Sequence, residues 1–157
     1  MKKRIWRLWS FKQPGSDSGA EAKKEEENMI RKFRNEDLEQ IMQLWLQANV
    51  QAHSFIEKTY WKSHYSEVRK MMPEAEIYVF DSGEGILGFI GLQEDYIAGI
   101  FTEENNRGRG IGKHLLQCAK QNHSSLSLHV YLKNERAVRF YEREGFMIAG
   151  EQSDEET

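Results

Sequence analysis

A glycine-rich basic segment, residues 107–113 (RGRGIGK), carries the clearest chemical signal in this chain. It follows an apolar run at 96–101 and precedes an apolar repeat typical of a helix, formed by Ile111, Leu115 and Ala119. A glycine turn that opens a helix leaves several backbone N–H groups without intrahelical partners, and the helix dipole adds positive charge at the same point. Because glycine lets an anion approach the main chain closely, the segment predicts a phosphate-binding turn.

Two well-known phosphate motifs do not fit this segment. A Walker loop requires serine or threonine where His114 stands, and a dinucleotide fingerprint requires glycine where Lys113 stands. Taken alone, the segment also fits a solvated loop or a basic patch for nucleic acid. The net charge of -3 and the lack of a long, uniformly basic face argue against nucleic acid as a partner.

Polar residues 12–28 divide the chain into a short basic and aromatic segment, 1–11, and a longer part, 29–157. The dividing stretch has no hydrophobic periodicity and predicts a flexible linker. A chain of 157 residues accommodates one domain, and 39% hydrophobic residues are enough to build its core. The sequence therefore predicts one folded domain over 29–157.

Composition disfavours several functional classes. No apolar run approaches the roughly 20 residues of a membrane-spanning helix, so we expect no membrane partner. The single cysteine, Cys118, lies in the predicted helix and is expected to be a buried structural thiol in a reducing cytoplasm. No pair of His, Cys or carboxylate residues has the spacing of a metal site, so we expect no metal.

The hydrophobic pattern after the linker predicts a mixed α/β domain with the order β-α-α-β-β-β-α-β-α-β. Gly88 and Gly91 interrupt one strand and predict a bulge or a close neighbour there. The expected strands cover 29–34, 76–81, 86–93, 96–102, 127–131 and 146–150. Four helices are expected: one that begins at the N-cap Asn35, one over 61–72, one from Ile111 to about residue 122, and one from the cap Asn134 to Gly145.

A second motif, N-x-x-A-x-x-F-Y at 134–141, follows the glycine turn after one helix and one strand. Together the two motifs resemble the paired signatures of the GNAT superfamily of N-acetyltransferases. The segment 52–56 (AHSFI) is similar to small bacterial members that acetylate peptide or protein lysines. The resemblance implies a mixed, mostly antiparallel sheet of six to seven strands with a central splay, flanked by four helices.

The resemblance also implies that acetyl-CoA is the cosubstrate and that it is held in three places. The turn amides would bind the pyrophosphate, the strand before the turn would pair with the pantetheine arm, and an asparagine would hydrogen-bond the arm. The residues so assigned are Ile100, Phe101, Thr102, Arg107, Gly108, Arg109, Gly110, Ile111, Gly112, Lys113 and Asn134.

Catalysis in the family is direct attack of an amine on the thioester in a ternary complex. Tyr141 matches the general acid that protonates the leaving thiolate. A lysine amine of pKa near 10.4 is about a thousandth deprotonated at neutral pH, so a base or a water chain must take its proton. We expect Glu103 to be that base, with Glu104, Glu94 and Asp95 as alternatives.

The acceptor is expected to contact His53, Phe55 and Tyr96, although no residue type there distinguishes a protein lysine from a small amine. Two other functions stay open. A non-catalytic CoA-binding module would keep the cleft without turnover, and Tyr141 argues for an enzyme instead. An RNA-binding domain would need exposed aromatic repeats that the chain lacks.

The end of the chain departs from the family pattern, because members usually carry a further short aromatic strand after the position of residues 151–157. Residues 3–11 (KRIWRLWSF) resemble that strand. We therefore expect a circular permutation in which Ile5–Phe11 pairs with Phe146–Gly150. The alternative is a disordered basic extension. A second departure, Glu104 where many members have proline, changes only the stiffness of the loop.

Overall fold

The computed structural model describes residues 2–9, 29–106 and 108–153; the linker predicted at 12–28 lies outside these ranges. The described elements are β1 (Lys2–Trp9), β2 (Ile30–Lys32), α2 (Leu38–Ala52), α3 (Lys58–Met71), β3 (Glu76–Asp81), β4 (Ile86–Gln93), β5 (Tyr96–Thr102), α4 (Ile111–Asn122), β6 (Ser125–Tyr131), α5 (Glu135–Arg143) and β7 (Met147–Ser153), with short 3-10 turns at Asn35–Asp37, Met72–Glu74 and Glu104–Asn106. None of the described helices is long and apolar enough to cross a membrane.

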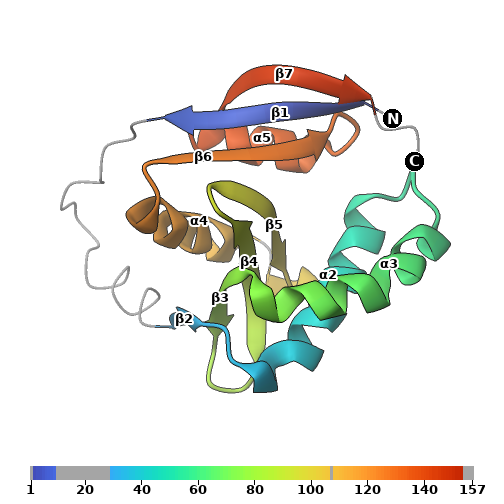
Figure 1. The fold of residues 1–157 in the computed structure, drawn as a ribbon, viewed down its shortest axis with the longest axis vertical. Coiled ribbons are helices and arrows are strands. Elements are labelled where there is room, and N and C mark those ends of the chain that lie inside the picture. The colour runs from blue at the N-terminus through green and yellow to red at the C-terminus, as the bar shows by residue number, and fades with distance from the viewer. Residues whose placement is uncertain (1, 10–28, 107, 154–157) are drawn as a thin grey trace.

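The strands form one seven-stranded sheet in the order β2-β3-β4-β5-β6-β1-β7. All neighbouring strands are antiparallel except β5 and β6, which are parallel. That parallel ladder holds only at Tyr96 with Ser127 and Ile97 with Leu128. Beyond these pairs the two halves of the sheet part, and Figure 1 shows β6, β1 and β7 crossing the direction of β3, β4 and β5. The sheet, its splay and its four α-helices confirm the fold predicted from the sequence.

The N-terminal strand lies inside the sheet, between β6 and β7. Ile5 is paired with Gly150 of β7, and Trp6 is paired with Leu128 of β6, both in antiparallel register. The strand covers Lys2–Trp9 rather than 5–11, and residues 10 and 11 lie outside the described ranges. Its partner runs from Met147 to Ser153 and is longer than the 146–150 expected. Trp6 is 1% exposed, so this strand supplies core as well as hydrogen bonds.

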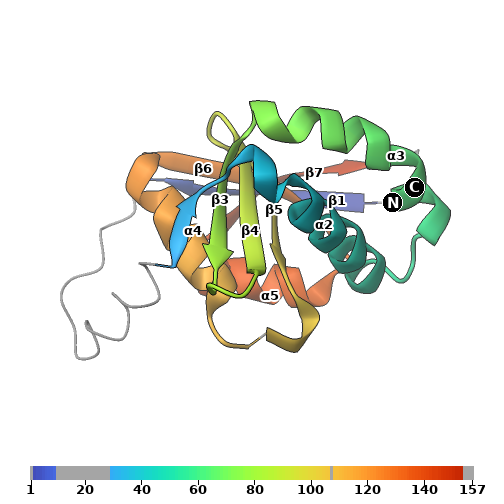
Figure 2. The ribbon, with the colours of Figure 1, turned by 90° about the horizontal axis from the view of Figure 1, so that it is seen from below.

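Helices cover both faces of the sheet (Figures 1 and 2). On one face, α2 and α3 pack on β3 and β4 through a cluster that includes Ile41, Trp45 and Phe89. On the other, α4 and α5 pack through Leu115, Leu116 and Tyr141, joined by Trp6 and Leu8 of β1. Each helix buries one apolar stripe, as the 3.6-residue repeat in the sequence requires.

The first helix begins later than the sequence predicts. Asn35 opens a 3-10 turn, and α2 starts at Leu38. The main-chain N–H of Arg34 donates to Asp37 at 2.8 Å, and the guanidinium of Arg31 donates twice to the same carboxylate, at 2.8 and 2.9 Å. These bonds from Arg31 lower the pKa of Asp37. A partly buried ion pair, which sequence spacing did not reveal, therefore organises the start of this helix.

Glycines in β4 allow α4 to approach the sheet. A Cβ on Gly88 would lie 2.9 Å from the main-chain oxygen of Phe101 and 3.0 Å from the side chain of Ile111, the first residue of α4. A register shift follows between Gly91 and Leu92. The close neighbour and the bulge predicted from these two glycines are both confirmed, and the first places the start of α4 directly over β4 and β5.

Candidate active site

A cleft of about 1090 Å³ opens where β5 and β6 part. Four parts of the chain line it: the end of β5 at 100–102, the turn and helix start between 106 and 113, α5 with its cap, and the end of α2. The splay creates this opening because main-chain pairing between β5 and β6 stops at Ile97 and Leu128. The edge of β5 beyond Ile97 is thereby left without a strand partner from β6, and its main-chain groups are available to an extended ligand.

The glycine turn presents main-chain donors to one end of the cleft. Gly108 and Gly110 have φ values of +84° and +79°, which glycine adopts without strain. Gly110 is the N-cap of α4, and no side chain caps the helix there. The first N–H groups of the helix, from Ile111 to Lys113, therefore lack intrahelical acceptors and face an anion site. Gly112, which also lines the cleft, leaves room between Ile100 and Phe140.

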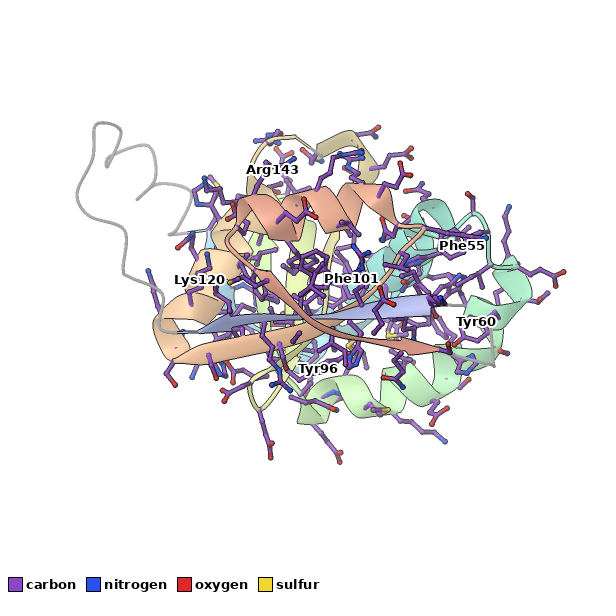
Figure 3. The ribbon with its side chains drawn as sticks, turned by 90° about the horizontal axis from the view of Figure 1, so that it is seen from above. Phe55, Tyr60, Tyr96, Phe101, Lys120 and Arg143 are labelled. Atoms are coloured by element: carbon purple, nitrogen blue, oxygen red, sulfur yellow. The ribbon has the colours of Figure 1, made fainter. Side chains whose placement is uncertain are left out.

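The structure separates the charged residues predicted for the turn. Lys113 lines the cleft. Arg109 does not; its guanidinium donates to the side-chain oxygen of Asn106. Arg107 lies outside the described residues. The strand residues predicted for the arm, Ile100 to Thr102, all line the cleft, and Figure 3 shows Phe101 near the centre of the molecule, between α5 and α3.

Asn134 stands at the cleft where α5 begins. It is the N-cap of the helix, and its Oδ1 accepts the N–H of Ala137 at 3.3 Å. Its Nδ2 lies 3.3 Å from Nε2 of His53. The cap predicted from the sequence is therefore confirmed, and the same side chain reaches across to the end of α2.

Tyr141 lines the cleft from the second turn of α5. It is 6% exposed and packs edge-on against Phe140 and Phe146, with ring centroids 5.1 and 5.4 Å away. Burial raises the pKa of Tyr141, and the nearby Tyr96 phenol adds to the shift. The Tyr141 side chain is therefore a protonated phenol at neutral pH and can donate a hydrogen bond, although its raised pKa makes it a weaker acid than a solvated phenol.

The acceptor residues predicted from the sequence do not all meet at the cleft. His53 lines it, whereas Phe55 and Tyr96 lie outside its lining. Phe55 packs on His53 and on Tyr131, with centroids 5.6 and 5.7 Å away. Tyr96 places its hydroxyl 2.8 Å from Nδ1 of His129, on the α3 side of the strands in Figure 3. Burial raises the pKa of Tyr96.

The predicted base, Glu103, also lies outside the lining of the cleft. Its carboxylate accepts from the side chain of Asn106, which does line the cleft, and from the N–H of Asn105. The alternative Glu104 accepts from Gln51, another lining residue, at 2.8 Å. Asp95 is engaged by His123 on a different part of the surface. Both glutamates therefore lie one side chain away from the cleft.

Three arginines were missed by sequence reasoning. Arg136, Arg139 and Arg143 of α5 all line the cleft. Their spacing of three and four residues places them on one face of the helix, a signal that was available in the sequence. Together with Lys113 they add positive charge to the lining of the cleft. Among the described residues, no three His, Cys, Asp or Glu side chains gather as a metal site would require.

Comparison with known proteins agrees with this geometry. Residues 73–148 match the model of the acetyltransferase (GNAT) domain. The chain is 36% identical to the peptidyl-lysine N-acetyltransferase YiaC of Escherichia coli, over 76% of this chain and 84% of YiaC. It is 30% identical to the peptidyl-lysine N-acetyltransferase YjaB of E. coli, over 77% and 83%. The solution structure of apo-form YjaB from E. coli has a TM-score of 0.67 at 29% identity, covering 75% of this chain and 81% of that chain. With this fold, this cleft and relatives matched over most of their length, the chain belongs to the GNAT family of acetyltransferases.

Proposed function

We propose that acetyl-CoA binds in the cleft between β5 and β6 and that the enzyme transfers its acetyl group to a primary amine, in the first place the side chain of a peptide or protein lysine. The observation that carries this proposal is the parting of β5 and β6 directly beside the uncapped start of α4. The names of YiaC and YjaB support lysine as the acceptor.

The cofactor contacts follow from the lining of the cleft. The N–H groups of residues 108–113 would hold the pyrophosphate, assisted by Lys113. Arg107 keeps the role predicted from the sequence, whereas Arg109 would have to leave Asn106 to reach the ligand. The edge of β5 at 100–102 would pair with the amides of the pantetheine arm in a β-type arrangement. Asn134 would donate to the arm where it enters the splay.

The reaction proceeds by direct attack. The neutral amine attacks the thioester carbonyl, the C–S bond breaks, and CoA departs as a thiolate. A main-chain N–H of Phe101 or Thr102 would stabilise the oxyanion. Tyr141 would protonate the thiolate, and the amine proton would pass through water at the rim to Glu103, whose carboxylate Asn106 holds in place.

A sequence of two measurements tests the proposal. Acetyl-CoA at 100 times its dissociation constant should stabilise the protein by about 2.7 kcal/mol in thermal unfolding. Release of free thiol in the presence of a lysine peptide should then follow. Binding without thiol release would identify a CoA-binding module rather than an enzyme, and no binding would remove acetyl-CoA from this cleft.

We further propose that β1 is the permuted final strand of the GNAT sheet. It lies between the strand that follows α4 and the strand that follows α5. Its first residue, Lys2, is paired with Ser153 at the end of β7. The end of β7 and the start of β1 therefore lie where a hairpin turn would join them in an unpermuted chain. A cytoplasmic location remains a prediction from the sequence.

A further inference from the structure

His53 joins the two helices that flank the cleft. Its Nδ1 lies 3.1 Å from the main-chain oxygen of Asn49, in the last turn of α2. Its Nε2 lies 3.3 Å from Nδ2 of Asn134, the cap of α5. The main-chain N–H of His53 donates to the same Asn49 oxygen at 3.0 Å. One imidazole therefore bridges the C-terminus of α2 and the N-terminus of α5.

The partners of these two side chains determine where their hydrogens lie. A main-chain oxygen only accepts, so Nδ1 of His53 carries the hydrogen and Nε2 of the neutral ring keeps a lone pair. Asn134 must then donate through Nδ2. Its Oδ1 faces the N–H of Ala137, which only donates. Two independent partners thus select the same orientation of the Asn134 amide.

Aromatic rings hold His53 in this position. It stacks on Trp61, with centroids 5.1 Å apart and an interplanar angle of 29°, and it meets Tyr131 edge-on at 5.1 Å. Phe55 closes a third side at 5.6 Å; Figure 3 shows it beside the connection between α2 and α3. Burial lowers the pKa of His53 to about 4, so the ring is neutral and Nε2 remains an acceptor at physiological pH.

We propose that His53 is a positioning residue for the cofactor rather than a direct contact of the acceptor: it holds one Nδ2 hydrogen of Asn134 and so directs the second toward the cleft, where it donates to an amide carbonyl of the pantetheine arm. This inference rests on the proposed function, which places the arm in this cleft. Without His53, Asn134 Nδ2 loses its acceptor, and only the bond from the Ala137 N–H to Oδ1 still orients the amide. The Nδ2 hydrogen that faces the ligand carbonyl is then held less firmly.

Substitutions at position 53 separate the bond to Asn134 from the packing. His53→Phe keeps a ring among the aromatic neighbours of position 53 and removes the nitrogen that accepts the hydrogen bond from Asn134. His53→Gln places an amide oxygen near the position of Nε2, whereas His53→Asn resembles the Nδ1 side and does not reach Asn134. Acetyl-CoA affinity is measured by calorimetry on the full chain. We expect His53→Phe to weaken it about five- to tenfold, the range for one hydrogen bond, and His53→Gln to restore most of the loss.

A double-mutant cycle adds a result that packing alone would not produce. Asn134→Ser keeps a capping hydroxyl for α5 but removes the amide donor. In that background His53→Phe should change acetyl-CoA affinity by less than about twofold, because the partner is already gone. If His53→Phe does not fold, the comparison of His53→Gln with His53→Asn replaces it. His53→Gln should bind acetyl-CoA about fivefold more tightly, because only glutamine reaches Asn134.

His64 offers a matched control. Its Nδ1 also lies near the carbonyl oxygen four residues earlier, that of Tyr60 at 2.8 Å, and its ring packs on Tyr60, but it does not line the cleft. His64→Phe should leave acetyl-CoA affinity unchanged. The inference is overturned if His53→Phe raises only the KM of the amine. It is also overturned if His53→Phe weakens acetyl-CoA affinity as much in the Asn134→Ser background as in the unmodified protein. If the unmodified protein did not bind acetyl-CoA, the proposed function itself would be overturned.

Discussion

Trp6 of β1 lies opposite Leu128 of β6, close to the splay that opens the cleft. Both side chains are buried in the cluster that contains Tyr141. The first strand of the chain is therefore packed against the helix that carries the proposed general acid. The fold of the site depends on residues that are remote from it in sequence.

Replacing Trp6 by alanine should destabilise the protein by about 3–5 kcal/mol, the usual cost of removing a fully buried large aromatic side chain. Urea unfolding measures this difference. Met147 on the neighbouring strand is 74% exposed, and Met147→Ala should change the free energy of unfolding by less than about 0.5 kcal/mol. Equal stabilities of the two variants would show that β1 does not occupy the sheet in solution.

A chain rearranged to begin at Met29, with residues 1–11 attached by a short linker after residue 157, should fold with the same sheet. The reason is that Lys2 and Ser153 are already paired, so the new connection closes a hairpin. Circular dichroism and acetyl-CoA affinity check the outcome. The same chain without residues 1–11 is the control and should be unstable, because β6 and β7 then lose their common neighbour.

Gly110→Ala should weaken acetyl-CoA binding, and Gly83→Ala should not. Both glycines have positive φ, +79° and +92°, and an added Cβ would meet no atom closer than 3.8 Å at either position. Each substitution should therefore cost a similar 1–2 kcal/mol of stability through backbone strain alone. Only Gly110 belongs to the turn beside the cleft, so its strain shifts the N–H donors. Parallel losses of affinity in both variants would contradict a pyrophosphate site at 108–113.

Tyr141→Phe should lower kcat about a hundredfold or more while leaving acetyl-CoA affinity within about twofold. The variant removes only the hydroxyl and keeps the packing against Phe140 and Phe146. Tyr65→Phe, a partly buried tyrosine of α3 on the opposite face of the sheet, is the control and should retain full activity. A normal kcat in Tyr141→Phe would show that solvent, and not Tyr141, protonates the thiolate.

The pH dependence of stability should carry a contribution from His123. Burial alone would lower its pKa, but bonds to Asp95 at 2.8 Å and to Glu76 at 3.0 Å outweigh burial and raise it. A raised pKa in the folded state means that the charged form stabilises the fold, fully so below the unfolded value near 6.5, and that this stabilisation is lost as the pH rises through the folded value.

His123→Gln should therefore reduce the free energy of unfolding most at pH 5.5 to 6 and progressively less above neutrality. Denaturant unfolding across that range gives the difference directly. His114 is half-buried on α4 and close to the glycine turn, so His64→Gln on α3 is the better control. A difference between the two proteins that grows with pH would show that His123 is neutral in the fold.

The local elements of the domain could be predicted from the sequence because neighbouring residues decide them. The β5 strand was located at Tyr96–Thr102, and α4 was located at Ile111–Asn122, since glycine turns and apolar repeats act over a few residues. Asn134 was recognised as a cap for the same reason. The glycine turn predicted a phosphate site because an uncapped helix start has the same chemistry wherever it occurs.

Contacts between side chains that are distant in the sequence could not be predicted from it. The bond from Asn134 to His53 depends on how α2 and α5 meet across the sheet, and the pair of Arg31 with Asp37 replaced the expected cap at Asn35. Glu103 is predicted as the general base and Tyr96 as a contact of the amine substrate, whereas in the structure their side chains contact Asn106 and His129. Local sequence determines which segments become helix or strand, whereas packing decides which side chains share a cleft, because that choice is made by contacts between segments that no local pattern records.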